Sequence, residues 1–144
     1  MKKLRLLDIG SANPRLEAGW NSIGDIEIVM FEPDKRSYDE LLINAKNENY
    51  MVFNYALSDK NETKELYLTK KPECTSLYKP NMNYHDKFPN ANRWEIVDTV
   101  NIDCKSLESI FNEVREYDFI KIDTQGSELE ILQGAIGGGS TALS

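Results

Sequence analysis

Residues 4–10 read LRLLDIG, a short apolar run that closes on an acid and a glycine. Runs of this kind are typical of strands buried in a sheet, so we predict a strand here. A second run, DIEIVMF over residues 25–31, lies between Gly24 and Pro33 and predicts another buried strand. Residues 11–23 between the two runs have little periodicity and predict a short or irregular helix at best.

Four later segments predict further strands. Residues 50–57, YMVFNYAL, and residues 117–122, YDFIKI, are apolar enough to be core strands. Residues 65–69, ELYLT, and residues 97–102, VDTVNI, alternate apolar and polar side chains. This alternation is typical of a half-exposed antiparallel pair.

Helices are predicted between these strands. Ser37 and Glu40 have the spacing of a capping box, and so do Ser127 and Glu130, so each serine is expected to open a helix. A third amphipathic pattern begins at Leu107. Strands that alternate with helices predict an α/β fold with a doubly wound, mostly parallel sheet, right-handed crossovers and a small inserted antiparallel pair.

The composition excludes several classes of function. The chain has 144 residues, of which 40% are hydrophobic and 28% charged, as expected for one globular domain. Its 17 Lys and Arg against 24 Asp and Glu give a net charge of -7, which argues against nucleic-acid binding. Cys74 and Cys104 lack the spacing of a disulfide framework or metal site, and no apolar run could span a membrane. The sequence therefore predicts a cytoplasmic protein.

The segment over residues 71–93 is rich in proline and asparagine and has no period. Such a segment is either a plain or disordered loop or a lid that contacts substrate. It contains His85, the one histidine of the chain, which is either a surface residue or a base that a closing lid would deliver.

The residues that follow each core strand are the candidate site, because ligands of doubly wound sheets lie beyond the carboxyl ends of the strands. Three of the four strand ends carry an acid, among them Asp8, Glu32 and Asp123. A dinucleotide turn needs G-x-G-x-x-G, and only Gly10 of that pattern is present. A ribose and an amine, as in S-adenosylmethionine, suit these acids better than a pyrophosphate does. Asp8 and Glu32 could instead cap the segments that follow them.

Four segments in this order resemble the FkbM-type methyltransferase family: LLDIGSAN, FEPDKRSYDELLINAKN, NYALSD and DFIKIDTQGSELEILQGA. With TSLY and VDTVNID between them, the resemblance covers residues 4–136. Its specific part is FEP followed by KID-x-x-G-x-E-x-x-x-L. The resemblance implies a Rossmann-like fold that binds S-adenosylmethionine and methylates a hydroxyl oxygen on a sugar, glycan, polyketide or other small-molecule acceptor.

The same resemblance assigns the site residue by residue. It implies that the cofactor is bound by Asp8, Gly10, Ser11, Glu32, Pro33, Asn54, Ala56, Leu57 and Asp123. Glu32 is then the ribose-binding acid, and Asp123 lies beside methyl donor and acceptor as the candidate catalytic base or as a binding group. The chain departs from the family's turn D-x-G-A-N-x-G, because Ala12 and Pro14 stand where asparagine and glycine are usual. Gln125 stands where glutamate is frequent.

The family's sheet continues after the helix at Ser127 with further strands. We therefore expect residues 1–136 to be an incomplete methyltransferase domain and residues 137–144, GGGSTALS, to be a flexible linker-like tail. An exposed fourth strand would need cover, for example in a homodimer. Two other functions stay open, namely a non-catalytic nucleoside-binding fragment or module of the same fold and a nucleotide-dependent oxidoreductase.

Overall fold

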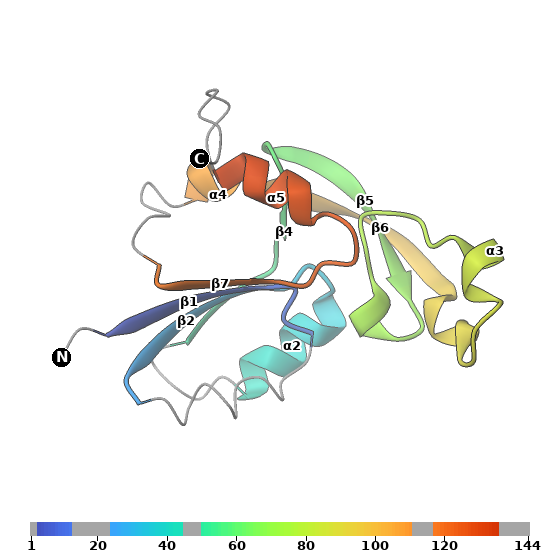
Figure 1. Ribbon diagram of the computed structural model, residues 1–144, viewed down its shortest axis with the longest axis horizontal. Helices are drawn as coiled ribbons and strands as arrows, with labels where there is room; N and C mark the ends of the chain where they lie inside the picture. Colours follow the sequence, from blue (N-terminus) through green and yellow to red (C-terminus); the bar gives the residue numbers. More distant parts are fainter. Residues whose placement is uncertain (1–2, 13–23, 45–49, 111–116, 136–144) are drawn as a thin grey trace.

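The computed structural model describes residues 3–12, 24–44, 50–110 and 117–135 (Figure 1). A four-stranded sheet of order β3-β2-β1-β7 is built from β1 (Leu4–Ile9), β2 (Ile26–Phe31), β3 (Tyr50–Phe53) and β7 (Phe119–Ile122). A three-stranded sheet of order β4-β6-β5 is built from β4 (Ala56–Leu57), β5 (Glu62–Thr69) and β6 (Ile96–Lys105). The helices are α2 (Lys35–Asn44), η2 (Pro72–Cys74), α3 (Met82–His85), η3 (Ala91–Trp94), α4 (Leu107–Ile110) and α5 (Glu128–Ala135).

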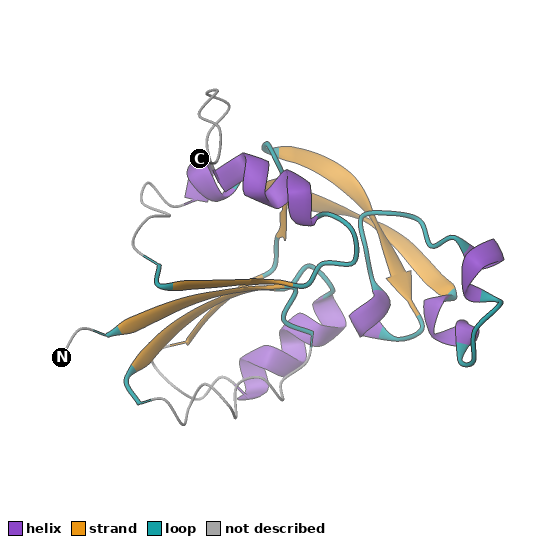
Figure 2. Ribbon diagram, in the orientation of Figure 1, coloured by secondary structure: helices purple, strands orange, loops and turns teal. Residues whose placement is uncertain are grey.

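The first sheet is wholly parallel, as the apolar runs predicted. β1 pairs with β2 on one side and with β7 on the other, and β2 pairs with β3. Helices lie on both faces of this sheet (Figure 2), α4 and α5 on one face and α2 on the other. The α/β, doubly wound architecture is therefore confirmed.

Alternate side chains of β1 and β2 pack into two separate hydrophobic clusters, one on each face of the sheet, because successive side chains of a strand point to opposite faces. On the side of α4 and α5 the buried cluster consists of Leu7, Ile9, Val29, Phe31, Leu57, Leu107 and Ile131. On the side of α2 it consists of Leu6, Ile26, Ile28, Met30 and Leu41. Both central strands are thus buried on both faces, which explains why their sequences are almost continuously apolar.

The predicted strand over residues 50–57 is wrong in one respect, since the structure divides it between the two sheets. β3 ends at Phe53, and β4 pairs in parallel with β6 of the second sheet. At the break, the side-chain amide of Asn54 donates to the carbonyls of Glu32 and Pro33, at 2.9 and 3.1 Å. These contacts turn the chain out of the first sheet. The antiparallel pairing of β5 with β6 was predicted correctly, and both strands are longer than expected.

The capping-box spacing predicted that Ser37 opens a helix, but in the structure Ser37 lies inside α2. The helix begins at Lys35, and Asp34 caps it, because its Oδ1 atom accepts a hydrogen bond from the backbone N–H of Arg36 at 3.0 Å. On this helix Leu41 is buried, whereas Leu42 is 49% exposed.

α5 begins directly after Ser127, as predicted, and reaches Ala135. β7, expected as a core strand, lies at the edge of its sheet among the described residues, and Phe119 and Ile120 are about half exposed. No helix in the described part of the chain is long and apolar enough to cross a membrane. Three predicted segments lie outside the described residues. They are residues 13–23 of the irregular connection predicted over 11–23, the end of the helix that starts at Leu107, and the tail over 137–144.

Candidate ligand-binding site

A pocket opens at the carboxyl ends of the first sheet, where the sequence predicted a ligand. It encloses about 860 Å³ of space, part of it open to solvent. Six of the predicted site residues line it: Gly10, Glu32, Pro33, Ala56, Leu57 and Asp123.

The floor of the pocket is formed where β1 and β7 end together. Gly10 has a φ of +81°, and a β-carbon at this position would overlap the backbone carbonyl of Asp123. The Gly10 N–H donates to the carbonyl of Phe31, and the Asp123 N–H donates to the carbonyl of Ile9, both at 2.9 Å. Glycine is therefore required here both by the backbone conformation and by the close approach of the Asp123 backbone, which follows β7.

Glu32 is a nearly buried carboxyl group at the end of β2, with 3% of the residue exposed. Its Oε1 atom accepts a hydrogen bond from the backbone N–H of Asp34 at 2.8 Å. The pKa of Glu32 is raised to about 8, and burial is the largest cause. The charges of Asp34 and Asp8 also act to raise this pKa, whereas the Asp34 N–H and the charge of Lys121 act to lower it. A ligand that donates hydrogen bonds to this group would compensate for its burial.

Asp8 contacts Lys121 rather than the pocket itself. The two residues are register partners on adjacent strands, and the Lys121 Nζ atom lies 2.8 Å from Asp8 Oδ1. Lys121 lines the pocket, and the sequence analysis did not select it. The signal that could have found it is its place two residues before Asp123, on a predicted core strand.

Two other predicted cofactor residues hold the backbone and are not among the residues that line the pocket. The Ser11 hydroxyl donates to the carbonyl of Asp8 at 2.8 Å. Asn54 holds the carbonyls of Glu32 and Pro33, as described above. In this structure both side chains shape the turns around the site, and their direct contact with a cofactor stays a prediction.

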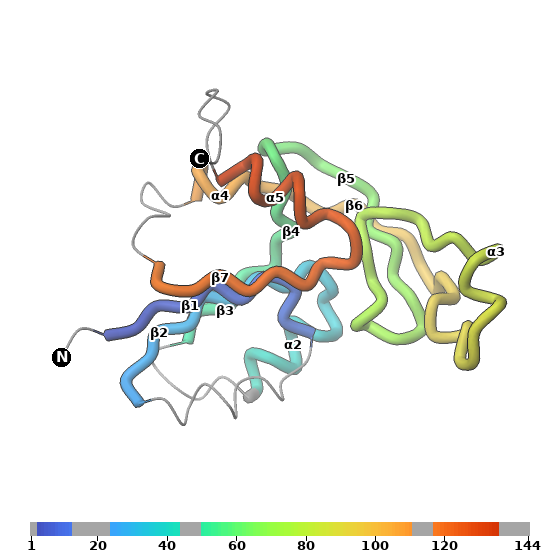
Figure 3. Tube along the Cα trace, in the orientation of Figure 1, coloured from blue at the N-terminus to red at the C-terminus, as the bar shows by residue number. Residues whose placement is uncertain are grey.

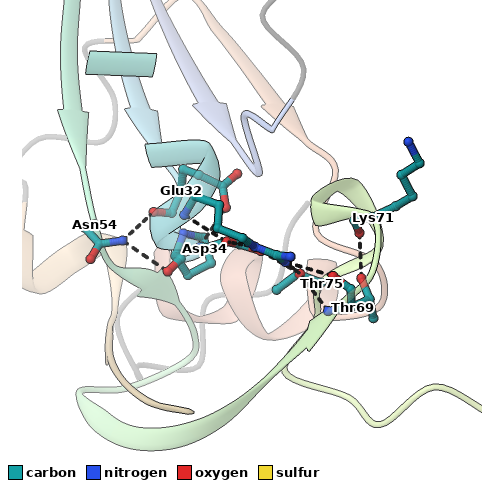
Figure 4. A network of polar contacts seen from close by, with 8 residues as sticks. Glu32, Asp34, Asn54, Thr69, Lys71 and Thr75 are labelled. Atoms are coloured by element: carbon teal, nitrogen blue, oxygen red, sulfur yellow. Dashed lines mark hydrogen bonds and ion pairs between the residues drawn. The ribbon is translucent and has the colours of Figure 1, made fainter. Parts of the chain in front are cut away.

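A polar network joins the loop after β2 to the second sheet (Figure 4). The buried carboxylate of Asp34 accepts hydrogen bonds from Arg36 Nε at 3.0 Å and from the Thr75 hydroxyl at 2.8 Å. Arg36 also donates to the carbonyl of Thr69 at 2.9 Å. Burial acts to raise the pKa of Asp34, but the hydrogen bonds from Arg36 and Thr75 outweigh it and lower that pKa. The carboxylate is thus held in its charged form.

Residues 72–78, which we call the strap, form one wall of the pocket. The strap lies beside the loop between β7 and α5 (Figure 3), where the Ser76 hydroxyl donates to the carbonyl of Gln125 at 2.9 Å. The Tyr78 hydroxyl contacts Glu130 of α5. The sequence predicted that Glu130 forms a capping box with Ser127. In the structure its carboxylate instead accepts a hydrogen bond from Tyr78 of the strap.

The rest of the segment over 71–93 lies away from the pocket wall. It forms short helices rather than one irregular loop. His85 stacks on Trp94, with ring centroids 4.1 Å apart, and is not among the residues that line the pocket. The structure therefore gives no support to its delivery as a catalytic base.

The charges that line the pocket are mainly negative. Among its described lining residues, Glu32, Glu73 and Asp123 are acids and Lys121 is the one cation. No group of three or more potential metal ligands occurs in the described ranges. This balance disfavours a pyrophosphate and suits a ligand that carries positive charge and hydroxyl donors.

Comparison with known proteins agrees with this architecture. The chain is similar in structure to the crystal structure of Methyltransferase FkbM from Methylobacillus flagellatus KT, with a TM-score of 0.55 and 17% sequence identity. The match covers 92% of this chain and 29% of that chain, and at this identity it shows the fold alone. No curated protein matches the chain. The family model of the methyltransferase FkbM domain matches residues 8–142, so the chain belongs to the FkbM methyltransferase family.

Proposed function

We propose that this chain binds S-adenosylmethionine and serves a methyl transfer to a hydroxyl oxygen of a sugar, glycan or other small molecule. The observation that carries the proposal is the buried carboxyl group of Glu32 at the end of β2, in the wall of the pocket. Membership of the FkbM methyltransferase family supports the reaction class. The acceptor class rests on the family resemblance of the sequence.

The hydrogen bonding of Glu32 fits a ribose. Among the described residues, the hydrogen bond that Glu32 accepts is made by its Oε1 atom, from the backbone of Asp34. The vicinal hydroxyls of a ribose would supply two further donors to this buried group. Each hydrogen bond to a charged carboxylate contributes about 1.5–3 kcal/mol, which is enough to offset part of the cost of its burial.

When bound, S-adenosylmethionine would supply the methyl group of its sulfonium for an in-line displacement, in which S-adenosylhomocysteine, a neutral thioether, is the leaving group. The residues of this chain would mainly align the reactants, and alignment alone is worth up to roughly 7–11 kcal/mol in ideal cases. Asp123, at the end of β7, would bind the cofactor's amine or take the proton of the acceptor hydroxyl. Its backbone is fixed by the hydrogen bond to Ile9 and by the close approach of Gly10.

Isothermal titration of the full chain with S-adenosylhomocysteine, at a pH above the Glu32 pKa of about 8, tests the proposal. We expect saturable binding that Glu32→Gln weakens about tenfold or more, because the amide cannot accept charge-assisted hydrogen bonds. Glu27→Gln is the matched control, since Glu27 lies on the same strand but pairs with Arg5 at 3.9 Å and is not among the residues that line the pocket.

Two outcomes would count against the proposal. A folded wild-type chain that does not bind S-adenosylhomocysteine would exclude cofactor binding. Binding without transfer of a labelled methyl group to any of a panel of hydroxyl acceptors would favour the non-catalytic nucleoside-binding module instead.

A further inference from the structure

Lys121 places a positive charge in the pocket wall. Its Nζ atom has three N–H donors, and one of them is directed to Asp8 Oδ1 at 2.8 Å. The side chain of Lys121 is 25% exposed, compared with 8% for that of Asp8. The ammonium group therefore covers the buried acid on one side and is accessible to the pocket on the other.

The surrounding charges determine what this ammonium group can attract. The other charged residues among the described pocket lining are the acids Glu32, Glu73 and Asp123. A carboxylate on a ligand would be repelled by each of these acids that is ionised and attracted at Lys121. The amino-acid part of S-adenosylmethionine carries one such carboxylate together with an ammonium group, so it needs both signs of charge in its site.

Lys121 is also placed along the path that such a ligand would follow. It lies within electrostatic range of Glu32, the proposed ribose site, since its charge lowers the pKa of that group. It also lies two residues before Asp123, at the end of the same strand. An amino-acid chain that runs from a ribose at Glu32 toward Asp123 would therefore pass Lys121.

We infer that Lys121 binds the α-carboxylate of the cofactor's amino-acid part and so makes the pocket selective for the intact amino acid. The inference rests on the proposed function, because it takes the same ligand in the same pocket. The competing explanation is that Lys121 only neutralises Asp8 and stabilises the strand pair. The two explanations differ in the expected effect of removing the lysine. If Lys121 binds the carboxylate, only ligands that carry this group lose affinity; if it only supports Asp8, ligands with and without the group lose affinity equally.

The experiment compares two ligands that differ by one group. S-adenosylhomocysteine carries the α-carboxylate, and 5′-deoxy-5′-(3-aminopropylthio)adenosine lacks it but keeps the ammonium group and the adenosine. Binding to the full chain is measured by titration calorimetry. We expect the wild type to prefer S-adenosylhomocysteine by about 10- to 100-fold, the range for a hydrogen bond between charged groups. Lys121→Met should bring this ratio close to one.

A matched control and a second variant keep the test decisive. Lys35→Met removes an exposed lysine that pairs with Asp39, and it should leave the ratio unchanged. If Lys121→Met does not fold because Asp8 is left buried without its partner, Asp8→Asn is compared with Asp8→Asn/Lys121→Met, which leaves no unpaired acid. The ratio should again fall only when the lysine is removed.

Three results would overturn the inference, and they are distinguishable. A wild type that binds both ligands equally well does not use the carboxylate. A Lys121→Met chain that weakens both ligands by the same factor uses the lysine only to support Asp8. A wild type that binds neither ligand removes the proposed function and this inference with it.

Discussion

The backbone of Gly10 packs directly against the carbonyl group of Asp123. Gly10 adopts a φ of +81°, and a β-carbon built on it would overlap the Asp123 carbonyl oxygen. The contact joins the first turn of the sheet to the loop after β7, which carries the candidate base. The position of Asp123 therefore depends on the absence of a side chain at residue 10.

We expect Gly10→Ala to lower the free energy of unfolding by about 2–5 kcal/mol. The left-handed conformation costs an alanine about 1–2 kcal/mol, and the overlap with Asp123 adds the cost of overpacking. Urea unfolding followed by circular dichroism measures the change. Because the overlap displaces Asp123, binding of S-adenosylhomocysteine should weaken as well.

Gly24→Ala separates the two causes. Gly24 also has a positive φ, +107°, but a β-carbon there would meet nothing within 4 Å. This variant should lose only the conformational contribution, about 1–2 kcal/mol, and keep its ligand affinity. Equal losses of stability in the two variants would show that the approach of Gly10 to Asp123 carries no cost.

Glu32 should make the stability of the protein depend on pH. Its pKa is raised by burial from 4.5 to about 8, so between these values the folded state holds a proton that the unfolded chain has released. Stability should therefore fall as pH rises from about 4.5 to about 8, by at most about 1.4 kcal/mol per pH unit, and level off above. Thermal unfolding at several pH values measures this slope. Glu32→Gln should flatten it, whereas Glu27→Gln should leave it in place.

The same carboxyl group should make nucleoside binding depend on pH in the opposite sense. Ribose hydroxyls donate to a carboxylate more strongly than to a neutral acid, so affinity should rise with pH up to about 8 and then level off. 5′-Methylthioadenosine is the suitable probe, because it carries no ammonium or carboxylate group that would titrate in this range. An affinity that stays constant from pH 6 to pH 9 would contradict a ribose at Glu32.

The parallel core could be predicted from the sequence because its strands are buried on both faces. β1 and β2 are apolar almost without interruption, and their observed bounds lie within one residue of the predicted ones. The division of residues 50–57 could not be predicted in this way. That run is continuous in the sequence, and the break depends on hydrogen bonds from Asn54 to Glu32 and Pro33, which become its neighbours only in the fold.

The candidate site was predictable to the extent that it lies at strand ends. Glu32 and Asp123 were selected because the carboxyl ends of parallel strands share one edge of a sheet. Lys121 was missed because its pairing with Asp8 depends on the register between two strands far apart in the sequence. The contact of Thr75 with Asp34 was missed because it joins a segment without periodicity to a loop 41 residues earlier in the sequence.

The network around Asp34 gives a prediction for stability that does not involve the ligand. The Asp34 side chain is fully buried and that of its partner Arg36 is 41% exposed, with Asp34 Oδ2 and Arg36 Nη2 2.6 Å apart. Arg36→Met would leave a buried carboxylate with fewer donors. We expect a loss of about 1–3 kcal/mol at pH 7, measured by urea unfolding, which is less than for a fully buried pair because solvent reaches the arginine.

Acid unfolding provides the second readout for Arg36. The hydrogen bonds from Arg36 and Thr75 overcome the effect of burial and hold the pKa of Asp34 below 3.8, so its stabilising contribution is lost only as pH falls below that value. Without the arginine, the pKa of Asp34 rises, and the acid-unfolding midpoint should move to higher pH. Lys35→Met is the control, because its exposed pair with Asp39 contributes about 0.5 kcal/mol or less. If Arg36→Met and Lys35→Met unfold at the same pH, the arginine does not hold Asp34 in its charged form.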